Sequence, residues 1–161
     1  MKDESYYIEK FTHLRRDEIP GRWTGSTTNK APHKPLLLIA VADAYVDQPI
    51  RSNFVGLNDS LEKHFEKYWS FIFNGKRQST IALPFYHLKS EDFWQLNPAN
   101  AEVPASCRKS CSALRAVVNG ASVDDELHVL LSKPKWANHL RSVLITTYFA
   151  PNLHREFFRT I

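Results

Sequence analysis

An apolar stretch from Leu36 to Val46, preceded directly by Pro35, is the feature that most constrains the fold of this chain. Proline is favoured in the first turn of a helix, where its missing N–H would have no partner in any case. The stretch therefore predicts a helix that opens at Pro35. Its longest uninterrupted run, Leu36 to Ala42, is about a third of the roughly 20 residues that a membrane-spanning helix needs. We expect no membrane contact, and 161 residues suit one domain with its own core.

Further helices are predicted from apolar positions at helical spacing. Tyr7, Phe11 and Leu14 share one stripe in a segment that starts acidic and ends basic, as the helix dipole favours. Gly120 is expected to end one helix, and Pro134 to open the last. The predicted helices cover residues 3–16, 35–46, 59–69, 110–119 and 122–131, followed by one that starts at 134 and includes 148.

The middle of the chain favours strands. Thr80 to Tyr86 and Phe93 to Leu96 are rich in aromatic and β-branched residues and flank a polar turn, which predicts a β-hairpin. Pro84 would lie inside the first strand and mark an edge or a bulge. The expected fold is α+β: a mainly helical single domain with a small antiparallel β-hairpin or sheet. Two helices followed by a hairpin give it a winged-helix-like order.

Charge and aromatic content together favour nucleic acid as the partner. Lys and Arg number 21 against 17 Asp and Glu, a formal charge of +4, and the chain has 10 Phe, 6 Tyr and 4 Trp. Basic side chains neutralise phosphates, and aromatic rings supply apolar contacts. Because most of these rings are also expected in the core and the excess of charge is mild, composition alone does not decide the partner.

The N-terminus and the cysteines favour a cytoplasmic protein. Met1 to Glu4 is charged, and no apolar stretch of the kind found in a secretory signal follows it. Cys107 and Cys111 are four residues apart, which does not match the spacing of a zinc site. We expect them to be reduced thiols with no chemical role.

Residue patterns typical of enzymes are missing from the sequence. It contains no glycine-rich phosphate loop, no His-Glu-x-x-His motif and no histidine pair at metal-ligand spacing. The acidic residues fall on predicted helices rather than in a cluster that could hold Mg²⁺. We therefore expect a binding domain with no catalytic residues, metal or cofactor, and keep a stand-alone nuclease as an alternative.

The candidate DNA-binding residues bracket a long polar loop, residues 17–33, and the predicted hairpin. Helix N-termini favour phosphate oxygens, and basic side chains beside one add charge. A solvated basic loop and a plain edge strand are the structural alternatives. The candidates are Arg22, Lys30, His33 and Lys34 around the loop, and Lys76 and Arg77 before the hairpin.

Two motifs resemble those of a known family. Ala31 to Leu38 reads APHKPLLL, and Ile81 to Leu88 reads IALPFYHL, with Phe93 to Leu96 (FWQL) following. Together they are similar to the DNA sulfur-binding domain of type IV McrA-like HNH restriction endonucleases. Ser112 to Arg115 and Leu144 to Phe149 also fit, so the resemblance covers nearly the whole chain.

This resemblance implies binding of duplex DNA at a phosphorothioate link, where sulfur replaces a non-bridging phosphate oxygen, in a suitable sequence context. The sulfur would lie in a shallow apolar cup, while His33 and Lys34 contact the adjacent backbone or base edges. Arg22, Lys30 and Arg77 would hold flanking phosphates. By the same resemblance, the cup residues would be Leu83, Pro84 and His87, with Pro104, Ser112 and Arg115 completing its wall.

Two residues depart from the family pattern: Leu83 stands where an aromatic residue is expected, and His87 where a small one is expected. The family's nuclease acids belong to an HNH domain, and no such motif occurs here. Residues 1–161 are therefore expected to be one DNA-recognition domain, the N-terminal part of a longer HNH endonuclease. A reader of another DNA modification or of unmodified DNA is the alternative among binding domains.

Overall fold

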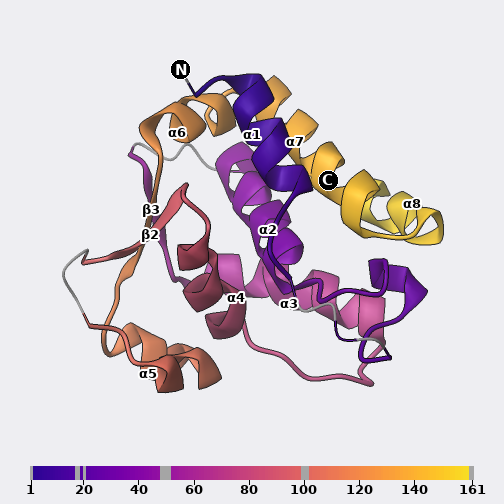
Figure 1. Cartoon of the computed structure of the whole chain (residues 1–161), viewed down its shortest axis with the longest axis horizontal. Coiled ribbons are helices and arrows are strands. Elements are labelled where there is room, and N and C mark those ends of the chain that lie inside the picture. The colour runs from indigo at the N-terminus through magenta and orange to yellow at the C-terminus, as the bar shows by residue number, and fades with distance from the viewer. Residues whose placement is uncertain (1, 17–18, 20, 48–51, 99–101, 160–161) are drawn as a thin grey trace.

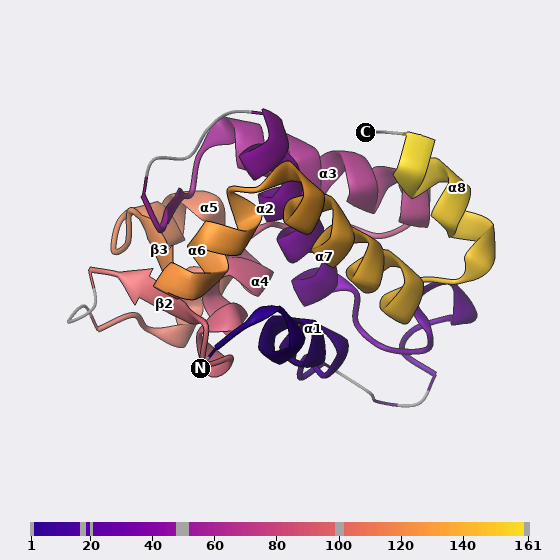
Figure 2. The ribbon, with the colours of Figure 1, turned by 90° about the horizontal axis from the view of Figure 1, so that it is seen from above.

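Helix α2 (His33–Asp47) passes through the middle of the molecule and carries the apolar run (Figures 1 and 2). The computed structural model describes residues 2–16, 19, 21–47, 52–98 and 102–159. Helix α2 starts two residues before Pro35, which still lies in its first turn. Leu36 and Leu37 are both completely buried, because neighbouring elements cover α2 on several sides. No helix among the described residues is long and apolar enough to cross a membrane.

The helices around α2 follow the predicted order. The closest neighbours of α2 are α7 (Pro134–Tyr148), α3 (Asp59–Phe73) and α4 (Ala82–His87). Helix α1 (Glu4–Thr12) packs on α7, and the Asp3 side chain caps it by accepting from the Tyr6 N–H. The start of α7 at Pro134 is confirmed. A final helix that was not predicted, α8 (Pro151–Arg159), packs back on α7.

Three short strands form one antiparallel sheet. These are β1 (Phe54–Gly56), β2 (Trp94–Asn97) and β3 (Gly120–Val123), and β3 lies between the other two. The central strand pairs Ala121 with both Val55 and Leu96. A mainly helical α+β domain with a small antiparallel sheet is therefore confirmed.

The predicted hairpin is wrong. Residues 82–87 form helix α4 rather than a strand, and β2 pairs with β3 instead. Pro84 is the third residue of α4, where a missing N–H leaves no helical hydrogen bond unmade. The Trp94 indole donates to the Phe85 carbonyl at 3.0 Å, so the second predicted strand holds the helix in place by a side chain. The winged-helix-like order is wrong for the same reason.

The predicted helices over 110–119 and 122–131 are both too long. The observed helices are α5 (Cys111–Arg115) and α6 (Asp125–Leu131), and β3 occupies much of the sequence between them. Gly120 is not a helix cap but the first residue of β3. A β-carbon there would lie 2.3 Å from the Val55 carbonyl oxygen, so only glycine fits between the strands.

A buried guanidinium joins four helices. Arg141 of α7 is 1% exposed, and its Nε donates to Asp43 Oδ1 of α2 at 2.7 Å. Its Nη2 donates to the Tyr68 hydroxyl of α3 at 2.9 Å and to the Phe157 carbonyl of α8 at 2.8 Å. The Tyr68 hydroxyl in turn donates to Asp43. The position of α2 relative to the other three helices therefore depends on this network.

We expect Arg141→Met to lower the free energy of unfolding by about 3 kcal/mol or more, because it leaves the Asp43 carboxylate without its cationic partner inside the protein. Urea unfolding followed by circular dichroism measures this. Arg155→Met, on the exposed face of α8, is the matched control and should change stability by less than about 0.5 kcal/mol. Equal losses in the two variants would contradict a structural role for the network.

Candidate nucleic-acid interface

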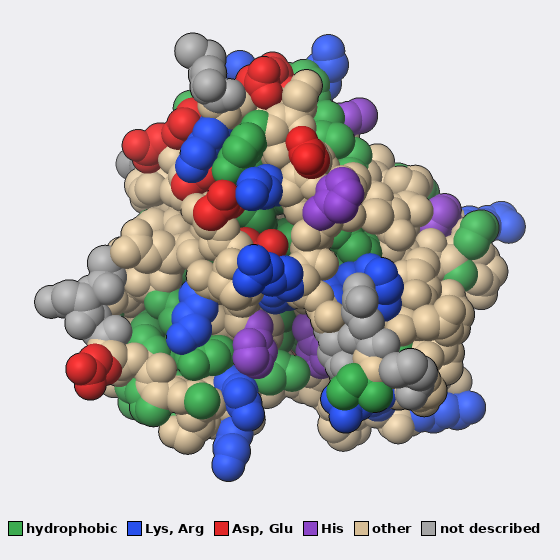
Figure 3. Space-filling view, in the orientation of Figure 1, with side chains coloured by type: hydrophobic (Ala, Val, Ile, Leu, Met, Phe, Trp, Pro, Cys, Tyr) green, Lys and Arg blue, Asp and Glu red, His purple; other side chains and the backbone are tan. Residues whose placement is uncertain are grey.

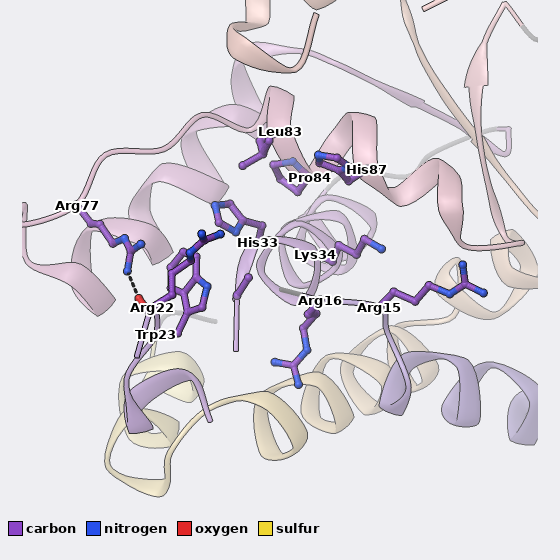
Figure 4. A pocket seen from close by; sticks show the side chains of 11 residues that line it. Arg15, Arg16, Arg22, Trp23, His33, Lys34, Arg77, Leu83, Pro84 and His87 are labelled. Carbon is purple, nitrogen blue, oxygen red and sulfur yellow. Dashed lines mark hydrogen bonds between the residues drawn. The ribbon is translucent and has the colours of Figure 1, made fainter. Parts of the chain in front are cut away.

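A pocket of about 640 Å³ opens where the start of α2 meets α4 and the loop before α2 (Figure 4). Its apolar side is the α4 surface, and most of its remaining lining is basic. The lining residues are Arg15, Arg16, Arg22, Trp23, Ala31, His33, Lys34, Arg77, Leu83, Pro84 and His87.

Helix α4 supplies the apolar side through residues one helical turn apart. Leu83 and His87 are four positions apart and therefore share a face, with Pro84 beside them. Leu83 and His87 are half-buried, and Pro84 is buried. This face offers a bound group carbon atoms and an imidazole ring instead of charge.

A tryptophan and an arginine form the opposite wall. The guanidinium carbon of Arg77 lies 3.7 Å from the centre of the Trp23 ring, and Arg77 Nη1 donates to the Arg22 carbonyl at 2.9 Å. The Trp69 indole donates to the Arg77 carbonyl at 2.8 Å. Residues 21–31 and the loop after α3 are thereby joined, and Arg77 is held while keeping its positive charge.

Aromatic rings also fix His33 at the start of α2. Its imidazole lies 5.4 Å from the Trp23 ring and 4.8 Å from the Trp69 ring, measured between centroids. Residues 21–32, which lead to it, are also held in place: Thr27 is completely buried, and its hydroxyl donates to the Lys30 carbonyl at 2.8 Å. The backbone carbonyl of Ser26 accepts from the Ala150 N–H, which anchors the loop to the α7–α8 junction.

Lys34 lines the pocket but is paired inside the protein. Its ammonium donates to Glu91 Oε2 and to Ser90 Oγ, both at 2.9 Å. Lys34 and Glu91 are each 8% exposed. Lys34 lies at the opposite side of the pocket from Arg77 (Figure 4).

Charge is divided across the face of the molecule shown in Figure 3. Histidines lie in a hollow near its middle with Lys and Arg around them, whereas acidic side chains gather in the upper part. Two acidic residues are already paired with lysines, Asp124 with Lys2 at 3.1 Å and Asp92 with Lys10 at 3.0 Å. A polyanion would therefore be attracted to the hollow rather than to the acidic end.

Burial lowers the pKa of His87, and the nearby charges of Arg108, Lys34 and Lys89 lower it further. His87 is therefore neutral at pH 7. Among the described residues, no group of three or more His, Cys, Asp or Glu side chains could hold a metal ion.

The structure brings together seven of the twelve predicted site residues: Arg22, His33, Lys34, Arg77, Leu83, Pro84 and His87. The other five, Lys30, Lys76, Pro104, Ser112 and Arg115, do not line the pocket. Arg115 is held elsewhere, because its Nη2 lies 3.1 Å from Glu62 and its Nε donates to the Leu57 carbonyl.

Sequence reasoning missed four lining residues: Arg15, Arg16, Trp23 and Ala31. Arg15 and Arg16 were interpreted only as the basic end of a helix, but α1 ends at Thr12 and leaves both arginines beyond it. The guanidinium of Arg16 lies 4.1 Å from the centre of the Tyr148 ring. One feature of the sequence could have identified Trp23 as a site residue: it directly follows the candidate residue Arg22 in a polar loop.

The fold and the pocket define a small, mainly helical domain with a basic, partly apolar ligand site. The chain belongs to the ScoMcrA-like DNA sulfur-binding domain family, whose model matches residues 8–161. No curated protein matches the chain.

Two solved structures share the fold. The sulfur-binding domain of ScoMcrA complexed with phosphorothioated DNA is 22% identical, with a TM-score of 0.59 and 93% of each chain covered. The type IV phosphorothioation-dependent restriction endonuclease ScoMcrA is 19% identical, with a TM-score of 0.56. The match to this endonuclease covers 93% of the present chain but only 31% of the endonuclease, so the chain spans about a third of its length.

We expect the His87 imidazole to titrate below its ordinary value of about 6.5. Because its pKa is lower in the folded than in the unfolded state, His87 should destabilise the fold as the pH falls below 6.5. An NMR titration of the ring protons measures the pKa. Arg108→Ala should raise it, whereas Lys133→Ala, at the start of α7, should leave it unchanged. A midpoint above 6.5 in the unaltered chain would contradict this account.

Proposed function

We propose that this chain binds duplex DNA at a phosphorothioate link, with the sulfur against Leu83, Pro84 and His87 and the neighbouring phosphates on arginines. One observation carries the proposal: an apolar helix face and four arginines line the same pocket. Membership of a DNA sulfur-binding family supports it.

The apolar face suits sulfur better than oxygen. Sulfur is larger, more polarisable and less strongly hydrated, so contact with carbon atoms gains dispersion energy and loses little hydration. A phosphate oxygen in the same place would lose water without gaining a donor. The neutral ring of His87 adds apolar contact area. A positive charge at this position would instead attract a sulfur and a phosphate oxygen equally.

Affinity then comes mainly from the basic rim. Arg22 is exposed, and Arg15 is exposed beyond the end of α1, so both can reach phosphates on either side of the modified link. Arg77 is pre-positioned by the Trp23 ring, which reduces the entropy lost when it binds. Lys30 and Lys76 lie outside the pocket, and we assign them to more distant phosphates. His33, at the start of α2, is our candidate for contact with a base edge and for dependence on sequence context.

We also propose that the chain acts as the recognition part of a longer HNH endonuclease. The matched region of the full-length ScoMcrA structure is 31% of a restriction endonuclease, which supports this arrangement. Cleavage would then belong to residues outside this chain.

The direct test compares two duplex pools with the same randomised flanking bases, which differ only in one phosphorothioate link. Fluorescence anisotropy at about 0.15 M salt should give at least roughly tenfold tighter binding of the modified duplex, because an unpaired oxygen in the pocket would lose hydration worth more than about 1 kcal/mol. Leu83→Asn, which makes the cup polar at nearly constant size, should reduce that preference about fivefold. Val129→Asn, on the exposed face of α6, should leave it unchanged. Equal binding of the two duplexes by the unaltered chain would refute the proposal and favour a reader of unmodified DNA.

Arg22→Ala should weaken binding of both duplexes by a similar factor, because a contact to a flanking phosphate does not sense the sulfur. The slope of log K against log salt should become shallower by about 0.9, the value for one released counterion. Lys133→Ala is the charge-matched control. Lys133 directly precedes α7, a 15-residue helix, and so lies about 22 Å from Tyr148, the residue beside Arg16 at the pocket. A loss confined to the modified duplex would contradict a phosphate-contact role for Arg22.

A further inference from the structure

A buried carboxylate lies directly behind a site that is proposed to bind a polyanion. Glu91 is 8% exposed, and its Oε2 accepts from the Lys34 ammonium at 2.9 Å. The Ser90 hydroxyl also donates to this oxygen at 3.3 Å, and the Arg15 N–H does so at 3.5 Å. A carboxylate behind the pocket repels any phosphate that binds there, so we asked what Glu91 contributes to binding.

Lys34 differs in this respect from the arginine on the opposite wall. Arg77 is held by a carbonyl oxygen and an aromatic ring, neither of which cancels its charge. Lys34 faces a full negative charge at hydrogen-bond distance in a buried setting, where the attraction is screened weakly. Two of its three N–H donors are used by Glu91 and Ser90. The pocket therefore contains a lysine whose charge and donors are largely committed inside the protein.

The pairing of Lys34 with Glu91 has different effects on the binding of a phosphate oxygen and of a phosphorothioate sulfur. A phosphate oxygen that leaves water needs a strong donor in exchange, and a free ammonium would be the best one available. Sulfur is a weaker acceptor and gains instead from the apolar face of α4, so it needs that donor less. When the Lys34 ammonium is bound to Glu91, the affinity for an ordinary phosphate is consequently lowered more than the affinity for a phosphorothioate.

We propose that Glu91 is a specificity-determining residue, which acts by holding the Lys34 ammonium away from the bound link and so excludes unmodified DNA from the pocket. This inference rests on the proposed function. Glu91 acts through Lys34 and is thus a positioning residue. Removal of the Glu91 carboxylate should increase binding of the unmodified duplex. Loss of a merely structural residue would instead weaken binding of both the unmodified and the phosphorothioate duplex.

The experiment uses Glu91→Gln, which keeps the size of the side chain but replaces the carboxylate with a neutral amide, so that the ion pair holding the Lys34 ammonium is lost. We expect its affinity for the unmodified duplex to rise roughly tenfold, because the freed ammonium can make a charge-assisted hydrogen bond to oxygen. Affinity for the phosphorothioate duplex should change by less than about twofold, so the preference for sulfur falls. The salt slope for the unmodified duplex should steepen by about 0.9.

Asp92→Asn is the matched control, because it makes the same change in net charge one residue away. Asp92 is exposed, bonds the Tyr6 hydroxyl at 2.8 Å and Lys10 at 3.0 Å, and does not line the pocket. It should leave the ratio of the two affinities unchanged. An equal fall of the ratio in Asp92→Asn would mean that net charge alone is responsible and would overturn the inference.

A double variant, Lys34→Met with Glu91→Gln, keeps the inference testable if Glu91→Gln fails to fold, as judged by its thermal unfolding. The double variant lacks both charges of the buried pair and has no ammonium to release, so it should keep the preference of the unaltered chain for sulfur. Loss of the preference in the double variant, or an unchanged ratio in a folded Glu91→Gln, would overturn the inference. Either result would overturn the role of Glu91 while the unaltered chain still prefers phosphorothioate DNA. If the proposed function itself is wrong, the unaltered chain shows no preference.

Discussion

The rest of the structure depends on the ion pair between Arg141 and Asp43. A guanidinium that is 1% exposed must regain in hydrogen bonds what it loses in hydration, and this one does so through a carboxylate, a hydroxyl and a backbone carbonyl. These acceptors come from α2, α3 and α8, while Arg141 itself belongs to α7. Because such bonds have strict geometry, they allow one arrangement of the four helices, and α2 is fixed at the centre.

The pocket lies at the opposite end of α2 from this ion pair. His33 and Lys34 open the helix, and Asp43 lies near its other end, so the network and the pocket share one rigid element. Helix α4 packs on α2, and the Trp94 indole holds it by the Phe85 carbonyl. The apolar face of α4 and the start of α2 are therefore preformed, so little ordering of these two elements should oppose binding. Within this arrangement the Lys34–Glu91 pair neutralises one basic residue of the pocket.

Local patterns predicted the long elements well and the short ones poorly. The apolar helix with Pro35 in its first turn and the helix that starts at Pro134 were predicted correctly, because in each the apolar spacing and the early proline both favour a helix. Residues 82–87 were assigned to a strand because aromatic residues suit strands and Pro84 suits an edge; in the first turn of a short helix the same proline is equally acceptable. Gly120 suited a helix cap, yet it pairs in β3 between β2, which was predicted as a strand, and β1, which no local pattern reveals.

The sequence by itself determined a mainly helical domain, a basic character and two motifs that carry a family resemblance, since these follow from residue types and short spacings. Only the tertiary structure decided which residues share the pocket. It placed Arg15, Arg16 and Trp23 there and held Arg115 on Glu62 instead, because contacts between segments far apart in the chain have no local signature. It also decided that Lys34 is paired with Glu91, 57 residues away, so that a cation which looks available for DNA in the sequence is already bound within the fold.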